Sequence, residues 1–533
     1  MTADSTPPGT GLSIDQALQL AAGHVQAGRL AEGELLCQKV LELDPDNAQA
    51  LHLLGVVAHL AGKQGVALAL IEKALRCQPD HAQAHYNLGV VLSVLRRPEA
   101  ALAAYRQAVA LDPANATALG NLGNIALELD LHEEALAAYD AVLGRHPQDA
   151  NFALARGITL YGMRRFEAAL TAFTYALALT PADPRMHWEI SQLHLMLGDF
   201  AAGWDAYESR FGVAQAHVWC YPYPYPRWQG EPLAGKTLLL HGEQGLGDEI
   251  MYASIYPELI AQARQVIICC QPHLVELFRA SFPGVRVEAQ LRADADAWTR
   301  RTADWLAGAP AVDYQIPFGS LARLRRRRAE DFPAHAGYLR AAAAKMQAWA
   351  AQLAQVQGLR VGICWAANPA IEDAVAARRS RKKSLTLQQL EPLLGVAQAG
   401  FVSLQTWEAA AQVSAAIPAT RARILDASGG LADFSDTAAL VMNLDLVITV
   451  DTSVAHLAGA LGKPVWLLLP WHADWRWHAA GNRSEWYPQA RLYRQSAPGD
   501  WAPVVEQMRG DLETLAQATV QARGPTLNAE MTA

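Results

Sequence analysis

The chain has 533 residues, 51% of them hydrophobic and 18% charged, which is enough to bury the cores of about three or four domains. Its formal net charge of −8 argues against a general nucleic-acid-binding protein, and the basic runs at 325–328 and 378–383 are interpreted as solvated surface. The first residues lack the basic and apolar segments of a signal peptide, and no apolar run is long enough to span a membrane. We therefore expect a cytoplasmic protein without a transmembrane segment, whose 6 cysteines are free thiols.

Residues 12–210 repeat with a period of 34 residues. Within each period, helical spacing occurs twice, and a proline stops the second helix because it lacks an N–H group and clashes with the preceding turn. These prolines are Pro45, Pro79, Pro113, Pro147 and Pro181. The period and pattern resemble the tetratricopeptide repeat, in about five full units and a sixth, less regular one that caps the stack.

The resemblance implies an all-α solenoid with a concave groove. Small residues such as Gly123 let two helices approach closely, and aromatic residues such as Tyr139 are expected to fill the space between neighbouring units. We expect the groove to bind a peptide or protein. A scaffold or self-association surface is the alternative interpretation.

Residues 211–235 alternate proline with aromatic residues, which predicts a stiff, extended linker that packs against another part of the chain. Beyond it, short apolar strands alternate with helical stretches, the pattern of parallel α/β sheets. We expect two such domains, 236–345 and 346–521, and disordered tails at 1–11 and 522–533. The predicted strands are 237–241, 265–270, 285–287, 358–365, 400–404, 444–450 and 464–469, with helices at 340–355 and 501–521.

A glycine-rich turn, Gly242-Glu-Gln-Gly-Leu-Gly-Asp248, directly follows the first predicted strand. Open α/β sheets bind ligands at the carboxyl ends of their strands, near helix starts that favour anionic groups. Asp248 is either the cap of the following helix or a general base. The turn is not a Walker loop, because no Gly-Lys-Ser/Thr follows it.

A second turn leads from the strand 444–450 into a helix that begins with Asp451, Thr452 and Ser453. Hydroxyls and unpaired N–H groups at a helix start suit a diphosphate, and His456, about one turn further, could reach the same anion. The alternative is a capped helix with a histidine that is satisfied in the core. The residues alone leave both interpretations open.

The second motif, Asp451-Thr452 followed by His456 and Pro464, resembles the nucleotide-sugar segment of the heptosyltransferase family of glycosyltransferases. That family has the GT-B architecture of two Rossmann-like domains. The resemblance therefore implies that the first α/β domain binds the acceptor and the second binds the nucleotide sugar.

Further matches imply roles for single residues. Gly247 and Asp248 match the Gly-Asp turn of the family's first domain, which implies that Asp248 deprotonates the acceptor hydroxyl. Gln405 ends a strand that lies beside the donor in the family. In the family, donor-phosphate residues usually follow a glycine-rich strand. In this chain that place is taken by a segment that ends in Asn368-Pro369, and the basic residues come later in the sequence. The implied donor-binding residues are Gly247, Asn368, Lys383 or Arg381, Gln405, Asp451, Thr452, Ser453 and His456.

The Asn-Pro pair at 368–369, a basic-Ser-x-x-Leu segment and the loop Trp475-Arg476-Trp477 resemble a bacterial group that joins tetratricopeptide repeats to such a transferase. Trp475 and Trp477 either shape the donor pocket or pack in the core. GT-B enzymes stabilise the leaving diphosphate with helix dipoles and basic side chains. We therefore expect no metal and no cofactor, although Asp294 and Asp296 form an Asp-x-Asp pair.

The leading hypothesis is a glycosyltransferase that moves a sugar, with inversion, from a nucleotide sugar to an acceptor hydroxyl. The repeats would recruit a protein acceptor that is modified on Ser or Thr, and the resemblance makes a flagellin-like acceptor one possibility. The alternatives are a heptosyltransferase-like saccharide or lipopolysaccharide transferase, and a non-catalytic adaptor that keeps the transferase fold.

Overall fold

The computed structural model describes residues 11–216, 218–219, 221, 223–290, 311–368 and 374–523. By internal contacts the chain divides into two compact units, Met1–Met186 and His187–Ala533. The pair Asp294 and Asp296 and most of the two predicted tails lie outside the described residues. Each unit has its own buried core.

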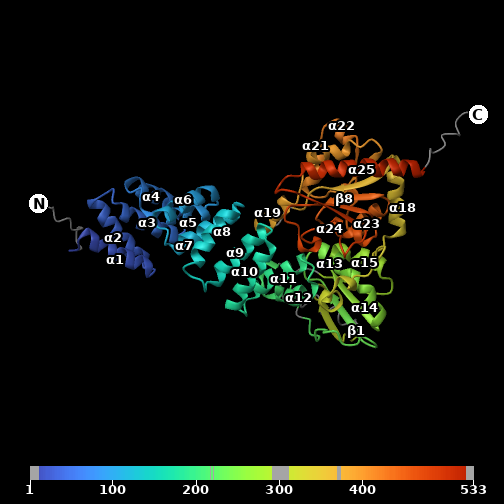
Figure 1. The fold of residues 1–533 in the computed structure, drawn as a ribbon, viewed down its shortest axis with the longest axis horizontal. Coiled ribbons are helices and arrows are strands. Elements are labelled where there is room, and N and C mark those ends of the chain that lie inside the picture. Colours follow the sequence, from blue (N-terminus) through green and yellow to red (C-terminus); the bar gives the residue numbers. More distant parts are fainter. Residues whose placement is uncertain are drawn as a thin grey trace, which may run out of the picture. The chain divides into compact units, whose positions relative to one another are not determined.

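The described part of the first unit consists of paired helices, in which each odd-numbered helix packs most closely on the next helix in the chain (Figure 1). This confirms the predicted all-α repeat array. The helices are α1 (Ile14–Gln26), α2 (Leu30–Leu43), α3 (Ala48–Leu60), α4 (Gln64–Cys77), α5 (Ala82–Val94), α6 (Pro98–Leu111), α7 (Ala116–Glu128), α8 (His132–Leu143), α9 (Ala150–Gly162) and α10 (Phe166–Leu179).

The turn inside each repeat contains a residue in the left-handed region of backbone space. At Arg96, Asp130 and Arg164 the φ angles are 57°, 61° and 58°. Glycine adopts this conformation without a steric cost, whereas a residue with a Cβ atom is strained there. The full set, at a spacing of 34 residues, is Gly28, Gly62, Arg96, Asp130, Arg164 and Gly198. The period of the sequence is therefore also a period of backbone conformation.

Glycines in α5, α7 and α9 allow a close approach to an aromatic ring of the next helix. A Cβ atom added at Gly123 would lie 2.6 Å from Cε1 of Tyr139, and one at Gly157 would lie 2.4 Å from the ring of Phe173. The aromatic was predicted to fill the space between neighbouring units, and it also packs within its own repeat. The ring lies first against the glycine of its own repeat, and Tyr139 also reaches Phe152 of the next repeat, at 6.2 Å between ring centroids.

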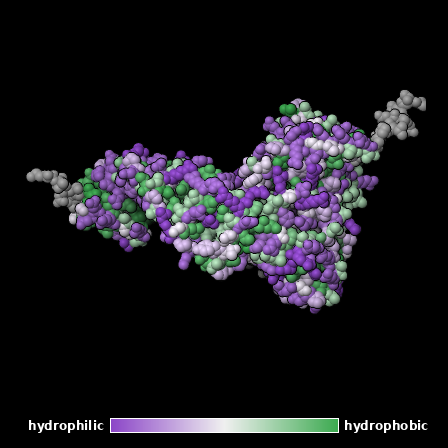
Figure 2. All heavy atoms as spheres, in the orientation of Figure 1, coloured by the Kyte–Doolittle hydropathy of each residue, from purple (hydrophilic) through white to green (hydrophobic). Residues whose placement is uncertain are grey.

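The first repeat exposes apolar side chains that later repeats cover. Figure 2 shows hydrophobic atoms over α1 and α2, and Leu20 of α1 is 46% exposed. Its equivalents 34 and 68 residues later, Leu54 and Leu88, are partly buried in cores that include the preceding repeat. No helix precedes α1 among the described residues, so Leu20 has no such neighbour.

In the second unit, the helices α11 (Pro184–Met196), α12 (Phe200–Tyr207) and η1 (Glu208–Gly212) lead to the linker. The linker packs on a sheet, as predicted. The side chain of Tyr223 is buried against Leu239, Ile267 and Cys269.

The first sheet has the strand order β3-β2-β1-β4, and all of its pairings are parallel. Its strands are β1 (Thr237–His241), β2 (Gln265–Cys270), β3 (Arg286–Ala289) and β4 (Tyr314–Pro317). The sequence did not predict β4, because its four residues carry no long apolar run. The two neighbours of β1 are thus β2 and β4.

The second sheet is also entirely parallel, in the order β10-β9-β8-β5-β6-β7. Strands β7 and β10 at its two edges were not predicted. The parallel α/β region after the repeats is confirmed. The strands are β5 (Leu359–Cys364), β6 (Ala399–Ser403), β7 (Ile424–Asp426), β8 (Leu446–Val450), β9 (Val465–Leu469) and β10 (Ala490–Arg494).

Helices cover both sheets of the second unit (Figure 1). They are α13 (Leu246–Tyr252), α14 (Tyr256–Gln262), α15 (Val275–Ser281), α17 (Phe318–Arg325), α18 (Ala343–Gln352), α19 (Ala374–Lys382), α20 (Glu391–Leu394), α21 (Ala411–Ala415), α22 (Pro418–Arg421), α23 (Phe434–Met442), α24 (Ser453–Ala460) and α25 (Ala502–Arg523). Among the described cysteines, Cys77 is exposed and the others are buried free thiols.

Candidate functional site

The strand order of the second sheet reverses between β5 and β8, and the region outside the carboxyl ends of these two strands is called the crevice below. Strand β6 follows β5 on one side, whereas β8 pairs with β5 on the other side, so the connections after these two strands leave in opposite directions. Ligands of open α/β sheets bind at such a switch point, outside the carboxyl ends of the strands. The turn after β8 begins with Asp451 and Thr452, which places two predicted site residues at this crevice.

Asp451 joins three segments of the chain. Its Oδ2 atom lies 3.2 Å from Nζ of Lys383, and its Oδ1 atom accepts a hydrogen bond from the indole N–H of Trp477 at 2.9 Å. Burial alone would raise the pKa of Asp451, but the nearby positive charge of Lys383 lowers it to about 2. The carboxylate is therefore ionised at neutral pH and holds Lys383 at the crevice.

The helix α24 starts at the crevice with a predicted hydroxyl pair. Thr452 is its N-cap residue and Ser453 its first residue, but the Thr452 side chain does not cap the helix. Instead, the Thr452 hydroxyl lies 3.2 Å from that of Thr449. The first N–H groups of a helix have no partner within the helix, so this start is suited to an anion.

His456 is buried one turn into α24. Its Nδ1 atom lies 2.9 Å from the hydroxyl of Tyr487, and its ring stacks on Trp477 at a centroid distance of 5.2 Å. Burial lowers the pKa of His456 to about 4, against the opposing effect of Asp451. The imidazole is uncharged at neutral pH, so it can offer a hydrogen bond to an anion but not a positive charge.

Asp248 lies in α13, the helix that follows β1 of the first sheet, and both of its carboxylate oxygens have partners. Its Oδ2 atom accepts a hydrogen bond from the backbone N–H of Gly245 at 3.2 Å, which caps α13, and its Oδ1 atom is bonded to the guanidinium of Arg476. Arg476 also bonds Asp474 at 2.6 Å and lies 4.3 Å from the ring centre of Trp475. Burial opposes the charge of Arg476, but Asp248 and Asp474 raise the pKa of its guanidinium well above the usual value.

Gly247 allows the two helices that carry these motifs to meet. A Cβ atom added at Gly247 would lie 2.8 Å from Cδ2 of His456. Helices α13 and α24 therefore pack side by side, and the predicted acceptor-side and donor-side motifs come together in one place (Figure 1).

Gln405 supports the crevice from the end of β6. Its Oε1 atom accepts hydrogen bonds from the N–H groups of Trp365 and Ala366 at 3.1 and 2.9 Å, and its Nε2 donates to the carbonyl of Ala366 at 3.0 Å. These bonds fix the turn after β5. Asn368 lies two residues beyond Ala366 on the same segment, and Arg381 lies in α19.

The two tryptophans of the loop after β9 have different surroundings. Trp475 packs edge to face against Trp204 of α12, at 5.3 Å between ring centroids, so it belongs to the core. Trp477 contacts both Asp451 and His456 and therefore belongs to the site. Sequence reasoning named this loop but gave no role to Arg476, because its partner Asp248 is 228 residues away. It also missed Tyr487, for which the sequence carries no signal.

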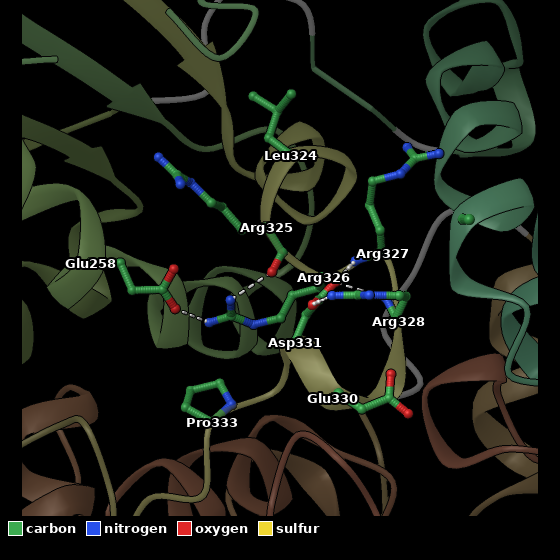
Figure 3. Close-up of a pocket in the computed structure, with 10 residues that line it drawn as sticks. Glu258, Leu324, Arg325, Arg326, Arg327, Arg328, Glu330, Asp331 and Pro333 are labelled. Carbon is green, nitrogen blue, oxygen red and sulfur yellow. Dashed lines mark hydrogen bonds and ion pairs between the residues drawn. The ribbon is translucent and has the colours of Figure 1, made fainter. Parts of the chain in front are cut away.

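The run of arginines at 325–328 lines a cavity of about 720 Å³ (Figure 3). It was expected to be solvated surface, which is wrong for Arg326, because this residue is 2% exposed and bonds Glu258 at 2.5 Å. Arg327 and Arg328 pair with Asp205 and Asp331. The cavity lining contains none of the predicted site residues. It is formed by Ala201, Glu258, Leu324, Arg325, Arg326, Arg327, Arg328, Glu330, Asp331 and Pro333.

The described residues contain no group of three or more His, Cys, Asp or Glu side chains that could hold a metal ion. The Asp-x-Asp pair at 294 and 296 lies outside this part of the chain. No described helix is both long and apolar enough to cross a membrane.

Comparison with known proteins identifies the repeats. Residues 18–82, 86–150 and 154–210 match the tetratricopeptide repeat family. The array is a tetratricopeptide repeat array. Such repeats indicate a role in protein interaction.

Over 318 residues the chain is 31% identical to Protein FlbA of Caulobacter vibrioides. The alignment covers 58% of this chain and 52% of that protein, so the chain spans about half the length of this curated relative.

Several solved structures resemble part of the chain. YrrB, described as a tetratricopeptide protein with an unusual peptide-binding site, is 26% identical with a TM-score of 0.30, over 32% of this chain and 88% of YrrB. PilF of Pseudomonas aeruginosa is 22% identical with a TM-score of 0.33, over 38% and 90%. MamA is 23% identical with a TM-score of 0.29, over 32% and 92%.

Proposed function

We propose that the chain is a GT-B glycosyltransferase that transfers a sugar from a nucleotide sugar to an acceptor hydroxyl. The observation that carries this proposal is the meeting of two motifs from different sheets. Lys383, Asp451 and the start of α24 stand at the switch crevice of the second sheet, and Asp248 of α13 reaches the same place from the first sheet.

The crevice offers the groups that a departing nucleoside diphosphate needs. Sugar transfer leaves negative charge on the diphosphate, and preorganised positive groups stabilise that charge best when water is limited. Lys383 supplies an ammonium group that Asp451 holds in place. The start of α24 adds N–H groups and the hydroxyls of Thr452 and Ser453.

Asp248 is the proposed base for the acceptor. The acceptor oxygen bonds to the anomeric carbon, the bond between that carbon and the diphosphate oxygen breaks, and the acceptor proton passes to Asp248. For this step the carboxylate has to exchange its bond to Arg476 for one to the acceptor hydroxyl. The diphosphate is itself a strong partner for a guanidinium, so an incoming donor can draw Arg476 away from Asp248.

The proposed acceptor is a protein. Tetratricopeptide repeats bind polypeptides along an extended surface, and an enzyme that acts on small saccharides alone has no need of such a surface. A Ser or Thr hydroxyl of a flagellin-like protein is the acceptor to test first.

The test uses the full-length chain with a panel of UDP-, GDP-, ADP-, TDP- and CMP-sugars, and measures release of the nucleotide with and without acceptor. Asp248→Asn should lower turnover by about 100-fold or more, because a general base contributes about that factor. Lys383→Met should raise KM for the donor. Asp205→Asn, which removes a carboxylate that pairs with Arg323 and Arg327 and with none of the predicted site residues, is the matched control and should retain turnover.

Acceptor choice is tested by the same reactions. Intact-mass analysis should show sugar added to the protein acceptor, and transfer to a lipopolysaccharide core saccharide instead would favour the saccharide transferase. If the wild-type chain binds and turns over no donor, the transferase proposal is wrong.

A non-catalytic adaptor is the second candidate, and one observation favours it. The charged side chains at the site pair with one another: Asp248 with Arg476, and Asp451 with Lys383. Such pairs also occur in sites that only maintain a fold. Capture of a protein by the wild-type chain without any nucleotide binding would support the adaptor.

A further inference from the structure

Trp407 has an unusual combination of backbone strain and exposure. Its φ and ψ angles are 62° and −160°, a region that is populated almost only by glycine. Its side chain is 67% exposed, the highest value among the exposed large hydrophobic residues of the described chain. The fold therefore bears a conformational cost at Trp407 that it does not recover by burying the indole.

The surroundings of Trp407 do not explain the strain. Within the described parts of the chain, its indole makes no hydrogen bond or ring contact, and only its backbone carbonyl is engaged, by the N–H of Ala410 at 3.1 Å. Strained residues of this kind persist where the surrounding structure enforces them, and they cluster at ligand sites.

The place of Trp407 in the fold points to the proposed donor site. It lies two residues after Gln405, whose amide holds the turn after β5 at the switch crevice. Strand β6, which leads to Trp407, is the neighbour of β5 on the side opposite β8. The end of β6 is therefore one and a half strand spacings, or about 7 Å, from the crevice between β5 and β8. That gap can be bridged by the ribose between a base and its diphosphate.

We propose that Trp407 forms the stacking face for the nucleobase of the donor. The inference rests on the proposed function and adds the place of the base to it. An exposed indole is a large flat surface that stacks on any base, because every base has a π-face. The diphosphate then lies at Lys383 and the start of α24, and the base lies over Trp407, at the end of β6.

The test measures binding of UDP, GDP, ADP, TDP and CMP to the full-length chain by calorimetry. For the nucleotide that binds best, Trp407→Ala should weaken binding about 5- to 150-fold, the range of a lost base–aromatic stack. Trp407→Phe should keep most of the affinity. Trp219→Ala removes a second exposed indole, 40% exposed and placed before the first sheet, and should leave binding unchanged.

Trp407→Gly separates stacking from folding. Glycine adopts the observed backbone angles without strain, so this variant should have an equal or higher urea midpoint than the wild type while it binds the nucleotide as weakly as Trp407→Ala.

Three results would overturn the inference. Equal affinity of Trp407→Ala and the wild type would remove Trp407 from the donor site and leave the transferase proposal intact. Unchanged nucleotide binding with loss of protein-acceptor capture would assign the indole to a protein partner instead. A wild-type chain that binds none of the five nucleotides would contradict both this inference and the transferase proposal.

Discussion

At the scale of single residues, the candidate site contains two buried ionisable groups, each of which keeps one protonation state at neutral pH. Asp451 is charged and His456 is neutral at neutral pH, and they contact the same indole. A buried neutral histidine makes stability depend on pH, because the unfolded chain takes up a proton that the folded chain cannot accept.

His456→Gln tests this linkage. The pKa of His456 is lowered by burial from 6.5 to about 4, so the wild type should lose stability as pH falls below about 6.5. Between pH 7 and pH 5 the loss from this residue is about 2 kcal/mol, which the variant should not show. Urea unfolding followed by tryptophan fluorescence measures the second unit selectively, because all 15 tryptophans lie beyond residue 187.

The control for this prediction is His273→Gln, which changes an exposed histidine of the same unit. It should follow the pH dependence of the wild type. The same slope for His456→Gln and the wild type would mean that the folded chain binds the His456 proton as readily as the unfolded chain, so that burial does not lower this pKa.

The ion pair of Asp248 and Arg476 gives a second prediction at this scale. Arg476→Met should cost about 3 kcal/mol of stability, because it leaves the partly buried Asp248 without its counter-charge. Asp248→Asn should cost less, since Arg476 keeps Asp474. The double variant should be more stable than the sum of the single effects, by about 1 kcal/mol or more in a urea double-mutant cycle. Additive effects would show that the pair does not form in solution.

At the scale of helices, three pairs of repeat helices, α5–α6, α7–α8 and α9–α10, pack with a glycine against an aromatic ring. Gly123→Ala should destabilise the array by about 1–3 kcal/mol, because the new methyl group would lie 2.6 Å from the ring of Tyr139. Gly23→Ala changes a helical glycine with nothing within 4 Å of the added atom, and should stabilise by about 0.5–1 kcal/mol. Thermal unfolding followed by circular dichroism should show opposite shifts.

A compensating change checks that the ring is the cause. Tyr139→Leu removes the ring, so the combination with Gly123→Ala should cost less than the two changes added together. If Gly123→Ala and Gly23→Ala shift the melting temperature in the same direction, the close approach does not limit the packing of α7 on α8.

The helices and most strands could be predicted from the sequence because their signals are local. The 34-residue period contains both helices of a repeat, and apolar runs such as 265–270 mark central strands. The edge strands β7 and β10 were missed because half-exposed strands carry no continuous apolar run. The backbone angle of Trp407 could not be predicted, since a bulky residue in that region contradicts the local preference of its type.

Contacts between distant segments were also beyond sequence reasoning. Asp248 was identified as a candidate base from its turn, but its pairing with Arg476 depends on how two sheets come together. The same holds for Gln405, which was expected beside the donor and proves to hold the turn after β5.

At the scale of the whole molecule, the end of the repeat array is part of the second unit. Residues 154–210 match the repeat family, yet the unit boundary by contacts falls after Met186. The reason is visible in the core. The indole N–H of Trp204 donates to the carbonyl of Arg326 at 2.8 Å, and its ring packs on Trp475. The last repeat helix therefore supports the loop that carries Arg476.

Arg210 makes the same connection to the first sheet. Its guanidinium is fully buried and bonds both carboxylate oxygens of Glu243, at 2.9 and 3.0 Å, and the hydroxyl of Ser320 at 2.7 Å. Glu243 follows β1, and Ser320 lies three residues after β4. Arg210 thus links the segments that follow β1 and β4. The phenol of Tyr207 donates to Gln244 in the turn that leads to Asp248.

Two truncated chains distinguish the boundary of the repeat pattern from the boundary of the folded unit. A chain of residues 211–533 lacks Arg210 and leaves Glu243 buried without a counter-charge, at a cost of about 3–5 kcal/mol from a total stability of about 5–15 kcal/mol. It should be poorly soluble or have a much lower urea midpoint by tryptophan fluorescence. A chain of residues 184–533 keeps α11, α12 and Arg210, and should unfold at the midpoint of the full-length protein.

Arg210→Met in the full-length chain should reproduce much of the loss without any truncation, because Glu243 again loses its partner. Equal midpoints for the two truncated chains would show that the second unit folds without the last repeat helix, and that the array and the candidate site are joined only by the linker.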